Sequence, residues 1–232
     1  HILHNIDKSF TYVLSGEDEM LGVNSIKDLI RIDKIYQNKI KDRMIKKGVI
    51  IVEPDTVRLS FDSIVKRGVT IEPFVSIKRG VTIEANVTIK SHSVIETCTI
   101  GKNSLIGPYA RIRPNRKIGE NVKIGNYGEV KNSIIGNNCS ISHLSYIGDS
   151  SFGKNINVGA GTITCNYDGK KKQKTIVEDG VFIGSNSSLI APIKIGKNST
   201  IGAGSVITDN IPPNSIALER SKLKILKKNR KK

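Results

Sequence analysis

Residues 158–175, VGAGTITCNYDGKKKQKT, concentrate side chains that can hydrogen-bond or neutralise a phosphate. They are Asn166, Tyr167, Lys170, Lys171, Lys172 and Lys174. The alternative is a tolerated surface insertion whose lysines contact only solvent. We favour binding because the segment interrupts a strict sequence repeat, and an excursion from a regular fold is more often functional than structural.

Two further side chains could take part in chemistry. His143, in ISHLSY, lies beside an aliphatic residue of the repeat, and a neutral imidazole is a suitable general base near neutral pH, although a lone histidine is more often structural. Cys165 could accept an acyl group, but a nucleophilic cysteine needs an adjacent base, and the nearby lysines provide only an electropositive setting. We therefore favour direct transfer and keep covalent catalysis as the alternative.

An internal repeat must position these groups. From residue 71 an aliphatic residue returns every six positions, with occasional one-residue shifts, as in Ile71, Ile77, Ile83, Ile89 and Ile95. Hexads of this kind predict an all-β fold, a left-handed parallel β-helix with about eighteen residues to each triangular coil, and roughly seven coils between residues 71 and 211. A sandwich of alternating strands would show a period of two without the fixed six.

One long helix is expected before the repeat, over residues 24–48. Ser25 and Asp28 form an S-x-x-D capping box, apolar residues then recur at helical spacing, and Gly48 supplies the stop.

Composition limits the class of protein. With 38% hydrophobic and 25% charged residues and no apolar run of about 18, the chain is expected to be a soluble, cytoplasmic protein with no membrane span. Three widely spaced cysteines give neither a disulfide framework nor a zinc site. The net charge of +16 is compatible with phosphorylated small molecules, and we expect no nucleic-acid partner because no aromatic-rich basic motif is present.

Three runs carry a close family resemblance: RPNRKIGENVKIGNYGEVKNSIIG, HLSYIGDSSFGKNINVGAGTITCNYDGKKKQKT and FIGSNSSLIAPIKIGKNSTIGAGSVI. From about Leu21 to Arg220 the chain resembles the C-terminal acetyltransferase domain of the bifunctional bacterial N-acetylglucosamine-1-phosphate uridyltransferase and glucosamine-1-phosphate N-acetyltransferase. The resemblance implies acetyl transfer from acetyl-CoA to the amine of glucosamine 1-phosphate, for the synthesis of UDP-N-acetylglucosamine, peptidoglycan and lipopolysaccharide. It also implies a homotrimer with sites at subunit interfaces.

The resemblance also implies roles for individual residues. His143 would be the catalytic base and Glu129 an assisting carboxylate. The sugar phosphate would be bound by Arg113, Lys131, Tyr146, Asn157 and Lys172, and acetyl-CoA by Ala160, Asn166, Tyr167, Ser185, Ala203 and Arg220.

Four segments are implied along the chain. Residues 1–23 resemble the last edge of the nucleotidyltransferase domain, 24–50 the connecting helix, 51–211 the left-handed β-helix acetyltransferase domain and 212–232 a basic C-terminal arm. Asn24 matches a family magnesium ligand, but its partner aspartate and the glycine-rich nucleotide loop have no counterpart in this sequence. We therefore expect no uridyltransfer, and Mg²⁺ only for that missing half.

Two other kinds of function stay open. One is another hexapeptide-repeat acyltransferase with a different acceptor or acyl donor, and the other is an inactive β-helical scaffold or fragment. A metal-dependent β-helical enzyme would need about three histidine ligands, and the repeat region contains only His92 and His143. Coenzyme A binding would separate an enzyme from a scaffold.

Overall fold

The computed structural model describes residue 14 and residues 16–114 and 116–219. The chain divides into two compact units between Ile40 and Lys41, and each is described by itself. Helix α1 (Ile26–Lys46) contributes to both units and lies within the predicted range of 24–48.

The ends of α1 have the predicted caps. Ser25 Oγ accepts a hydrogen bond from the Asp28 amide at 3.2 Å and donates to Asp28 Oδ2 at 2.8 Å, so the capping box is confirmed. Two hydrogen bonds to the carboxylate, chiefly that from the Ser25 hydroxyl and then that from the Asn24 amide, lower the pKa of Asp28 below its ordinary value. At the other end, Gly48 adopts a positive φ of 85° and its amide donates to Ile45 O, which confirms the stop. A short 3-10 helix, η2 (Glu17–Glu19), precedes α1.

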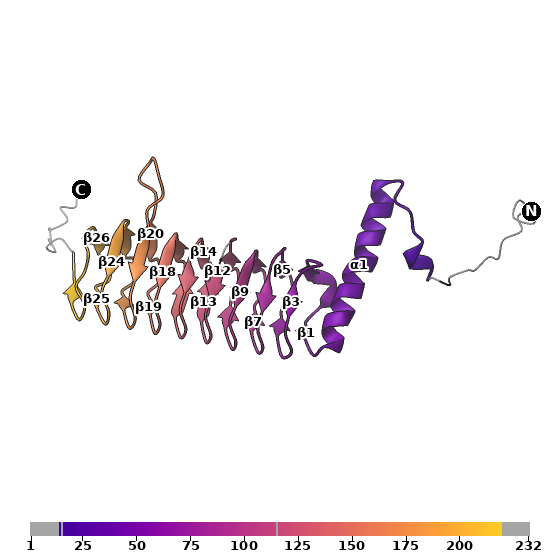
Figure 1. Cartoon of the computed structure of the whole chain (residues 1–232), viewed down its shortest axis with the longest axis horizontal. Helices are drawn as coiled ribbons and strands as arrows, with labels where there is room; N and C mark the ends of the chain where they lie inside the picture. Colours follow the sequence, from indigo (N-terminus) through magenta and orange to yellow (C-terminus); the bar gives the residue numbers. More distant parts are fainter. Residues whose placement is uncertain (1–13, 15, 115, 220–232) are drawn as a thin grey trace, which may run out of the picture. The chain divides into compact units, whose positions relative to one another are not determined.

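Residues from Ile50 to Ala217 form a parallel β-helix of three sheets (Figure 1). The first sheet contains β1 (Ile50–Ile51), β4 (Thr70–Ile71), β7 (Thr88–Ile89), β10 (Leu105–Ile106), β13 (Lys123–Asn126), β16 (Ser140–His143), β19 (Asn157–Val158), β22 (Phe182–Ile183), β25 (Thr200–Ile201) and β27 (Ile216–Ala217). The second contains β2 (Arg58–Leu59), β5 (Ser76–Ile77), β8 (Val94–Ile95), β11 (Arg111–Ile112), β14 (Glu129–Lys131), β17 (Tyr146–Gly148), β20 (Ile163–Cys165), β23 (Ser188–Ile190) and β26 (Val206–Ile207). The third contains β3 (Ile64–Val65), β6 (Thr82–Ile83), β9 (Cys98–Ile100), β12 (Arg116–Ile118), β15 (Ile134–Ile135), β18 (Ser150–Phe152), β21 (Thr175–Val177) and β24 (Ile193–Ile195).

The hexapeptide repeat supplies the core of these coils. The second residue of most two-residue strands points inward, and isoleucines such as Ile71, Ile89 and Ile106 are fully buried. Each short strand covers the one below it, so the stack buries a continuous column that no single coil could bury alone. The predicted β-helix of hexapeptide repeats, preceded by one helix, is confirmed.

The roughly seven coils expected between residues 71 and 211 are confirmed, and the solenoid continues by one coil at each end. Eight strands of the first sheet, from β4 to β25, make seven coils, and β1 and β27 bring the total to nine. The first coil escapes the hexad pattern because the 3-10 helix η3 (Pro54–Thr56) lies between the inward residues Ile51 and Leu59. The last coil closes with Ala217, which is not a branched aliphatic residue.

We name the three corners by the order in which the chain turns. The first corner leads from the first sheet to the second, the second corner from the second to the third, and the third corner back to the first. At the third corner five asparagines with positive φ form a ladder, in which each of the first four donates from Nδ2 to Oδ1 of the next at 3.0 to 3.4 Å: Asn86, Asn103, Asn121, Asn138 and Asn155. At the first corner four rings stack with centroids 4.7 to 5.2 Å apart: Phe74, His92, Tyr109 and Tyr127.

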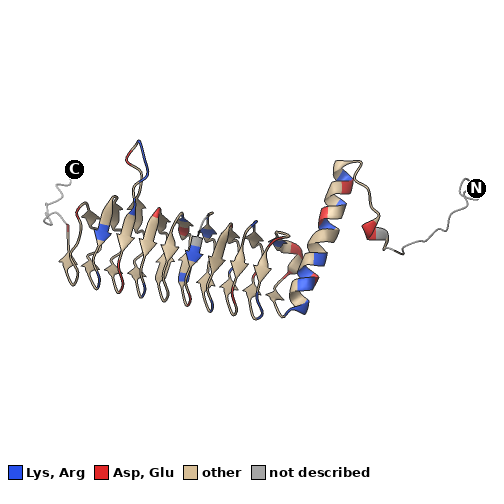
Figure 2. Cartoon of the chain, viewed as in Figure 1, with Lys and Arg blue, Asp and Glu red and all other residues tan. Residues whose placement is uncertain are grey.

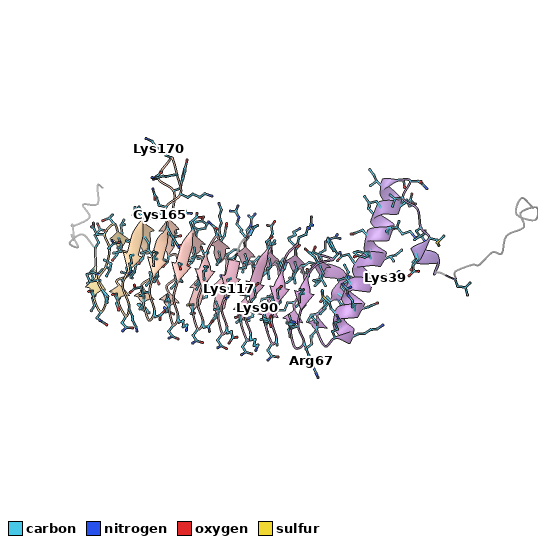
Figure 3. All side chains as sticks on the ribbon, in the orientation of Figure 1. Lys39, Arg67, Lys90, Lys117, Cys165 and Lys170 are labelled. Carbon is cyan, nitrogen blue, oxygen red and sulfur yellow. The ribbon has the colours of Figure 1, made fainter. Side chains whose placement is uncertain are left out.

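The predicted interruption is a loop between β20 and β21 (Figure 1). Figure 3 shows Cys165 at its base and Lys170 near its tip. The loop is shorter than the dozen or so residues expected, because β20 continues the repeat with a polar inward residue, the buried Thr164. Among the described residues, no helix is both long and apolar enough to span a membrane.

Candidate functional site

Four of the residues assigned to the site from the sequence follow one another along the first corner. The carbonyl oxygen of His143 accepts a hydrogen bond from Gly161 N at 3.2 Å, that of Ala160 from Asn186 N at 2.7 Å, and that of Ser185 from Gly204 N at 2.8 Å. His143, Ala160, Ser185 and Ala203 therefore occupy equivalent places in successive coils. We call this set the corner row. It has an exposed imidazole at one end and small side chains beyond it, an edge against which an extended ligand can lie.

His143, which carries this imidazole, is the last residue of strand β16. Its backbone is the register partner of Asn126 on β13, and His143 Nδ1 lies in a short hydrogen bond with Asn126 Oδ1. Asn126 is not among the site residues predicted from the sequence. The sequence feature that could have indicated Asn126 is its place one coil before His143.

Three cations converge on the second sheet. The Lys172 ammonium, within hydrogen-bonding reach, lowers the pKa of Lys131 below its ordinary value, and the Arg113 guanidinium lowers it further. Arg113 Nη1 also pairs with Glu129 Oε1 at 3.0 Å. We call Arg113, Lys131 and Lys172 the cation cluster. Like charges this close favour a bound anion between them.

Glu129 therefore contacts a different partner from the one its assigned role suggests. Its carboxylate is paired with Arg113, while the ring of His143 is hydrogen-bonded to Asn126. In this arrangement Glu129 orients the guanidinium of the cation cluster.

Tyr146 lies between the corner row and the cation cluster. It starts β17 as the register partner of Glu129, and Gly148 two residues later is the register partner of Lys131. A Cβ on Gly148 would lie 2.5 Å from the Tyr146 hydroxyl and 2.7 Å from its ring, so only glycine leaves room for this ring along the strand. The phenol therefore points towards the Lys131 side of the sheet.

The loop after β20 is held by its own aspartate. Asp168 Oδ1 accepts hydrogen bonds from the amides of Lys170 and Lys171, both at 2.8 Å, and Gln173 Nε2 donates to Oδ2. These three hydrogen bonds lower the pKa of Asp168 to about 2, and the bond from the Lys171 amide has the largest effect. The lysines lie on the limb that returns to the solenoid (Figure 2).

The remaining predicted residues lie away from the corner row. Asn166 is buried at the second corner, where its Nδ2 donates to Asp149, and Tyr167 is exposed on the loop, where its hydroxyl donates to Gly169 O at 2.7 Å. Asn157 is on the first sheet, on β19. Arg220 lies outside the described residues. One chain thus places the predicted residues on more than one surface.

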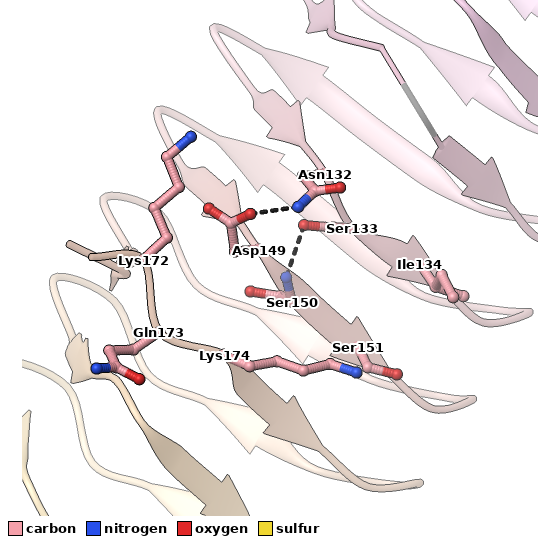
Figure 4. Close-up of a pocket in the computed structure, with 9 residues that line it drawn as sticks. All are labelled: Asn132, Ser133, Ile134, Asp149, Ser150, Ser151, Lys172, Gln173 and Lys174. Carbon is pink, nitrogen blue, oxygen red and sulfur yellow. Dashed lines mark hydrogen bonds between the residues drawn. The ribbon is translucent and has the colours of Figure 1, made fainter.

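A cavity of about 410 Å³ lies beside the root of the loop (Figure 4). Its lining includes Lys172, Lys174, Asp149 and Ser151, and the Asp149 carboxylate is hydrogen-bonded by Asn132. Lys172 is shared with the cation cluster. The cavity therefore extends the basic surface around the second corner.

The residues present do not fit a magnesium site at Asn24. Its backbone amide donates to Asp28 Oδ2 at 3.3 Å, and Asp28 is already used in the helix cap. No group of three His, Cys, Asp or Glu side chains suited to a metal occurs in the part of the chain that the structure describes.

Comparison with known proteins adds the family. The bacterial transferase hexapeptide model matches residues 62–97 and 174–209, and the GMPPB C-terminal domain model matches residues 94–186. The bifunctional protein GlmU of Thermosipho africanus is 41% identical over 97% of this chain and 54% of its own length, and that of Bradyrhizobium sp. is 46% identical over 89% and 46%. The chain is homologous to the C-terminal half of GlmU. It spans about half the length of the GlmU proteins that it matches.

Solved structures with lower identity are also similar. The UDP-N-acetylglucosamine acyltransferase of Francisella novicida is 20% identical with a TM-score of 0.43, over 73% of this chain and 66% of its own. A hexapeptide-repeat acetyltransferase of Vibrio cholerae, complexed with acetyl coenzyme A, is 18% identical with a TM-score of 0.37, over 52% and 65%. With the GlmU relatives and the hexapeptide repeats, the chain is an acyltransferase-like domain related to GlmU.

Proposed function

We propose that this chain transfers the acetyl group of acetyl-CoA to the amine of glucosamine 1-phosphate, in the cytoplasm, as a step towards UDP-N-acetylglucosamine. The observation that supports it best is the exposed imidazole of His143 at one end of the corner row, on the coils that also carry the cation cluster. The homology to half of GlmU supports the same reaction.

In the proposed reaction the cation cluster binds the sugar phosphate, and Tyr146 contacts the sugar. Acetyl-CoA lies along Ala160, Ser185 and Ala203. The amine attacks the thioester carbonyl, the C–N bond forms, the C–S bond breaks, and the thiolate leaves to become the free thiol of coenzyme A. His143 accepts the amine proton. Positioning of the two substrates supplies much of the acceleration, so no acyl-enzyme on Cys165 is needed.

The spread of the predicted residues supports a homotrimer. Asn157 and Tyr167 are exposed on other parts of the chain than its corner row, and Asn166 is buried at the second corner. In the proposed assembly a neighbouring copy brings such residues, with the C-terminal arm, to each corner row.

The test is thiol release from acetyl-CoA by the purified chain, with glucosamine 1-phosphate or glucosamine as acceptor. Release that requires the phosphate and is abolished in His143→Ala supports the proposal. His92→Ala is the matched control, because His92 is the other histidine of the solenoid and lies in the ring stack.

Other outcomes identify the alternatives. Release only with another amine or alcohol would point to a different hexapeptide-repeat acyltransferase. No release and no coenzyme A binding by a chain that forms trimers would indicate an inactive scaffold.

A further inference from the structure

Asn126 and His143 are neighbours because two strands are longer than most others in their sheet. Strands β13 and β16 each have four residues, whereas the other described strands of the first sheet have two. The extra length adds the register pair Asn126 and His143 at the first corner. Their side chains therefore leave the sheet side by side.

The hydrogen bond between them selects one form of the imidazole. The atom facing His143 Nδ1 is the amide oxygen Oδ1 of Asn126, and an amide oxygen can only accept. Nδ1 must therefore carry the proton. A neutral imidazole has a single N–H, so Nε2 keeps its lone pair. Among the residues that the structure describes, none is hydrogen-bonded to Nε2, and the His143 side chain is exposed.

The backbone holds this pair in place. The Asn126 carbonyl oxygen accepts a hydrogen bond from Leu144 N at 3.0 Å, so the residue that follows His143 is bonded to the same asparagine as the imidazole ring. The preceding Gly125 is buried, and a Cβ there would overlap the carbonyl oxygen of Ser142. Only glycine lets the two strands approach this closely.

Two other polar side chains near the first corner have partners of their own. Glu129, on the strand that follows Asn126, is paired with Arg113 at 3.0 Å, and the Tyr127 ring is stacked on Tyr109. On the next coil the equivalent of His143 is Ala160, which has no polar side chain. Asn126 is thus the described side chain that orients the ring.

We infer that Asn126 is a positioning residue, which holds His143 in the Nδ1-protonated tautomer and so leaves Nε2 as the atom that accepts the amine proton. The inference rests on the proposed function for its chemical meaning, but the tautomer itself can be measured without activity. A neutral amide sets the tautomer without adding the negative charge of the carboxylate found in many catalytic triads.

The first experiment is ¹⁵N NMR of the full chain labelled at histidine, with His143→Ala to assign the ring signals. We expect the Nδ1–H form in the parent chain and in Asn126→Asp, and a shift towards the Nε2–H form in Asn126→Ala. Asn137→Ala is the matched control, because Asn137 Oδ1 also accepts a hydrogen bond, from Glu120 N at 3.0 Å, away from the first corner. An Nε2–H form in the parent chain, or an unchanged tautomer in Asn126→Ala, would overturn the inference.

The second experiment measures kinetics. A positioned base contributes about 10²- to 10⁴-fold. Asn126→Ala should therefore lower kcat by about 10- to 100-fold, with the KM values of both substrates little changed. Asn126→Asp should retain activity but move the acidic limb of the kcat/KM profile to higher pH, since a carboxylate favours the imidazolium. An unchanged kcat in Asn126→Ala contradicts the inference. If the parent chain transfers no acetyl group, the proposed function fails and the NMR result still decides the tautomer.

Discussion

Gly148→Ala tests whether the position of Tyr146 matters for the acceptor. An added Cβ would lie 2.5 Å from the phenolic oxygen, and ordinary contact begins at 3.4 Å, so the hydroxyl must move by about 0.9 Å. A displacement of about 1 Å in a positioned group can cost about 10²-fold in rate. We expect kcat/KM for glucosamine 1-phosphate to fall about 10- to 100-fold, with the KM for acetyl-CoA little changed.

Stability should change little in this variant, because the atoms that must move are the far end of a side chain. We expect a change in the free energy of unfolding below about 1 kcal/mol, measured by urea denaturation. Gly22→Ala is a neutral control, since its nearest neighbour would be 3.9 Å away.

A double-mutant cycle tests whether the methyl group of Gly148→Ala acts through the Tyr146 ring. Once the ring is removed by Tyr146→Ala, the added methyl group has nothing to displace, so the double variant should be no worse than Tyr146→Ala alone. Full activity in Gly148→Ala, or a further independent loss in the double variant, would show that the ring is not held as described.

Three other outcomes are expected. The Lys172 ammonium lowers the pKa of Lys131, whereas a phosphate bound beside Lys131 favours its charged form. When the pH is near this lowered pKa, binding of the sugar phosphate is therefore accompanied by protonation of Lys131. The KM for glucosamine 1-phosphate should therefore begin to rise at a lower pH than it would beside a lysine of ordinary pKa, and Lys172→Met should move this rise to higher pH. The same pH profile in the parent chain and in Lys172→Met would contradict charge repulsion between the two lysines. Asp168→Ala should speed tryptic cleavage after Lys170 and Lys171, with Asp209→Ala as the control. Since the pKa of Asp168 in the folded chain is about 2, the hydrogen bonds of this turn in the parent chain should be lost only as the pH falls from about 3.8 towards 2. Equal cleavage rates would refute the role of this turn. Thr164→Val should destabilise the chain by about 1–3 kcal/mol in urea denaturation, because the buried Gly148 amide loses its acceptor at 2.8 Å. A neutral or stabilising effect would show that the amide finds another partner.

The repeat could be read from the sequence because its physical cause is local. Each coil needs a branched aliphatic residue at the same inward place, so Ile71, Ile89 and Ile106 mark the fold before any contact is known. The pattern is lost where another solution replaces an aliphatic side chain, as at Thr164, whose hydroxyl bonds to the neighbouring backbone.

The partners of the site residues could not be read in the same way. Most successive coils are offset by seventeen or eighteen residues, as between Asn126 and His143 or between Arg111 and Glu129. A slip of one residue exchanges inward and outward faces, so a one-residue uncertainty changes which side chains are neighbours. The pairs Asn126–His143 and Glu129–Arg113 therefore required the structure. The family resemblance indicated His143 and Lys131 but not what holds them.

The asparagine ladder of the third corner bears on how this sequence can evolve. At a left-handed position glycine is usually an acceptable replacement, yet here each inner amide both donates to one neighbour and accepts from another. Losing Asn121 breaks two bonds of about 0.5–1.5 kcal/mol each, while losing Asn86 at the end breaks one. Substitutions should therefore accumulate first at the ends of the ladder and later at its inner positions. Related chains that have lost part of the ladder should keep its inner asparagines and lack the terminal ones.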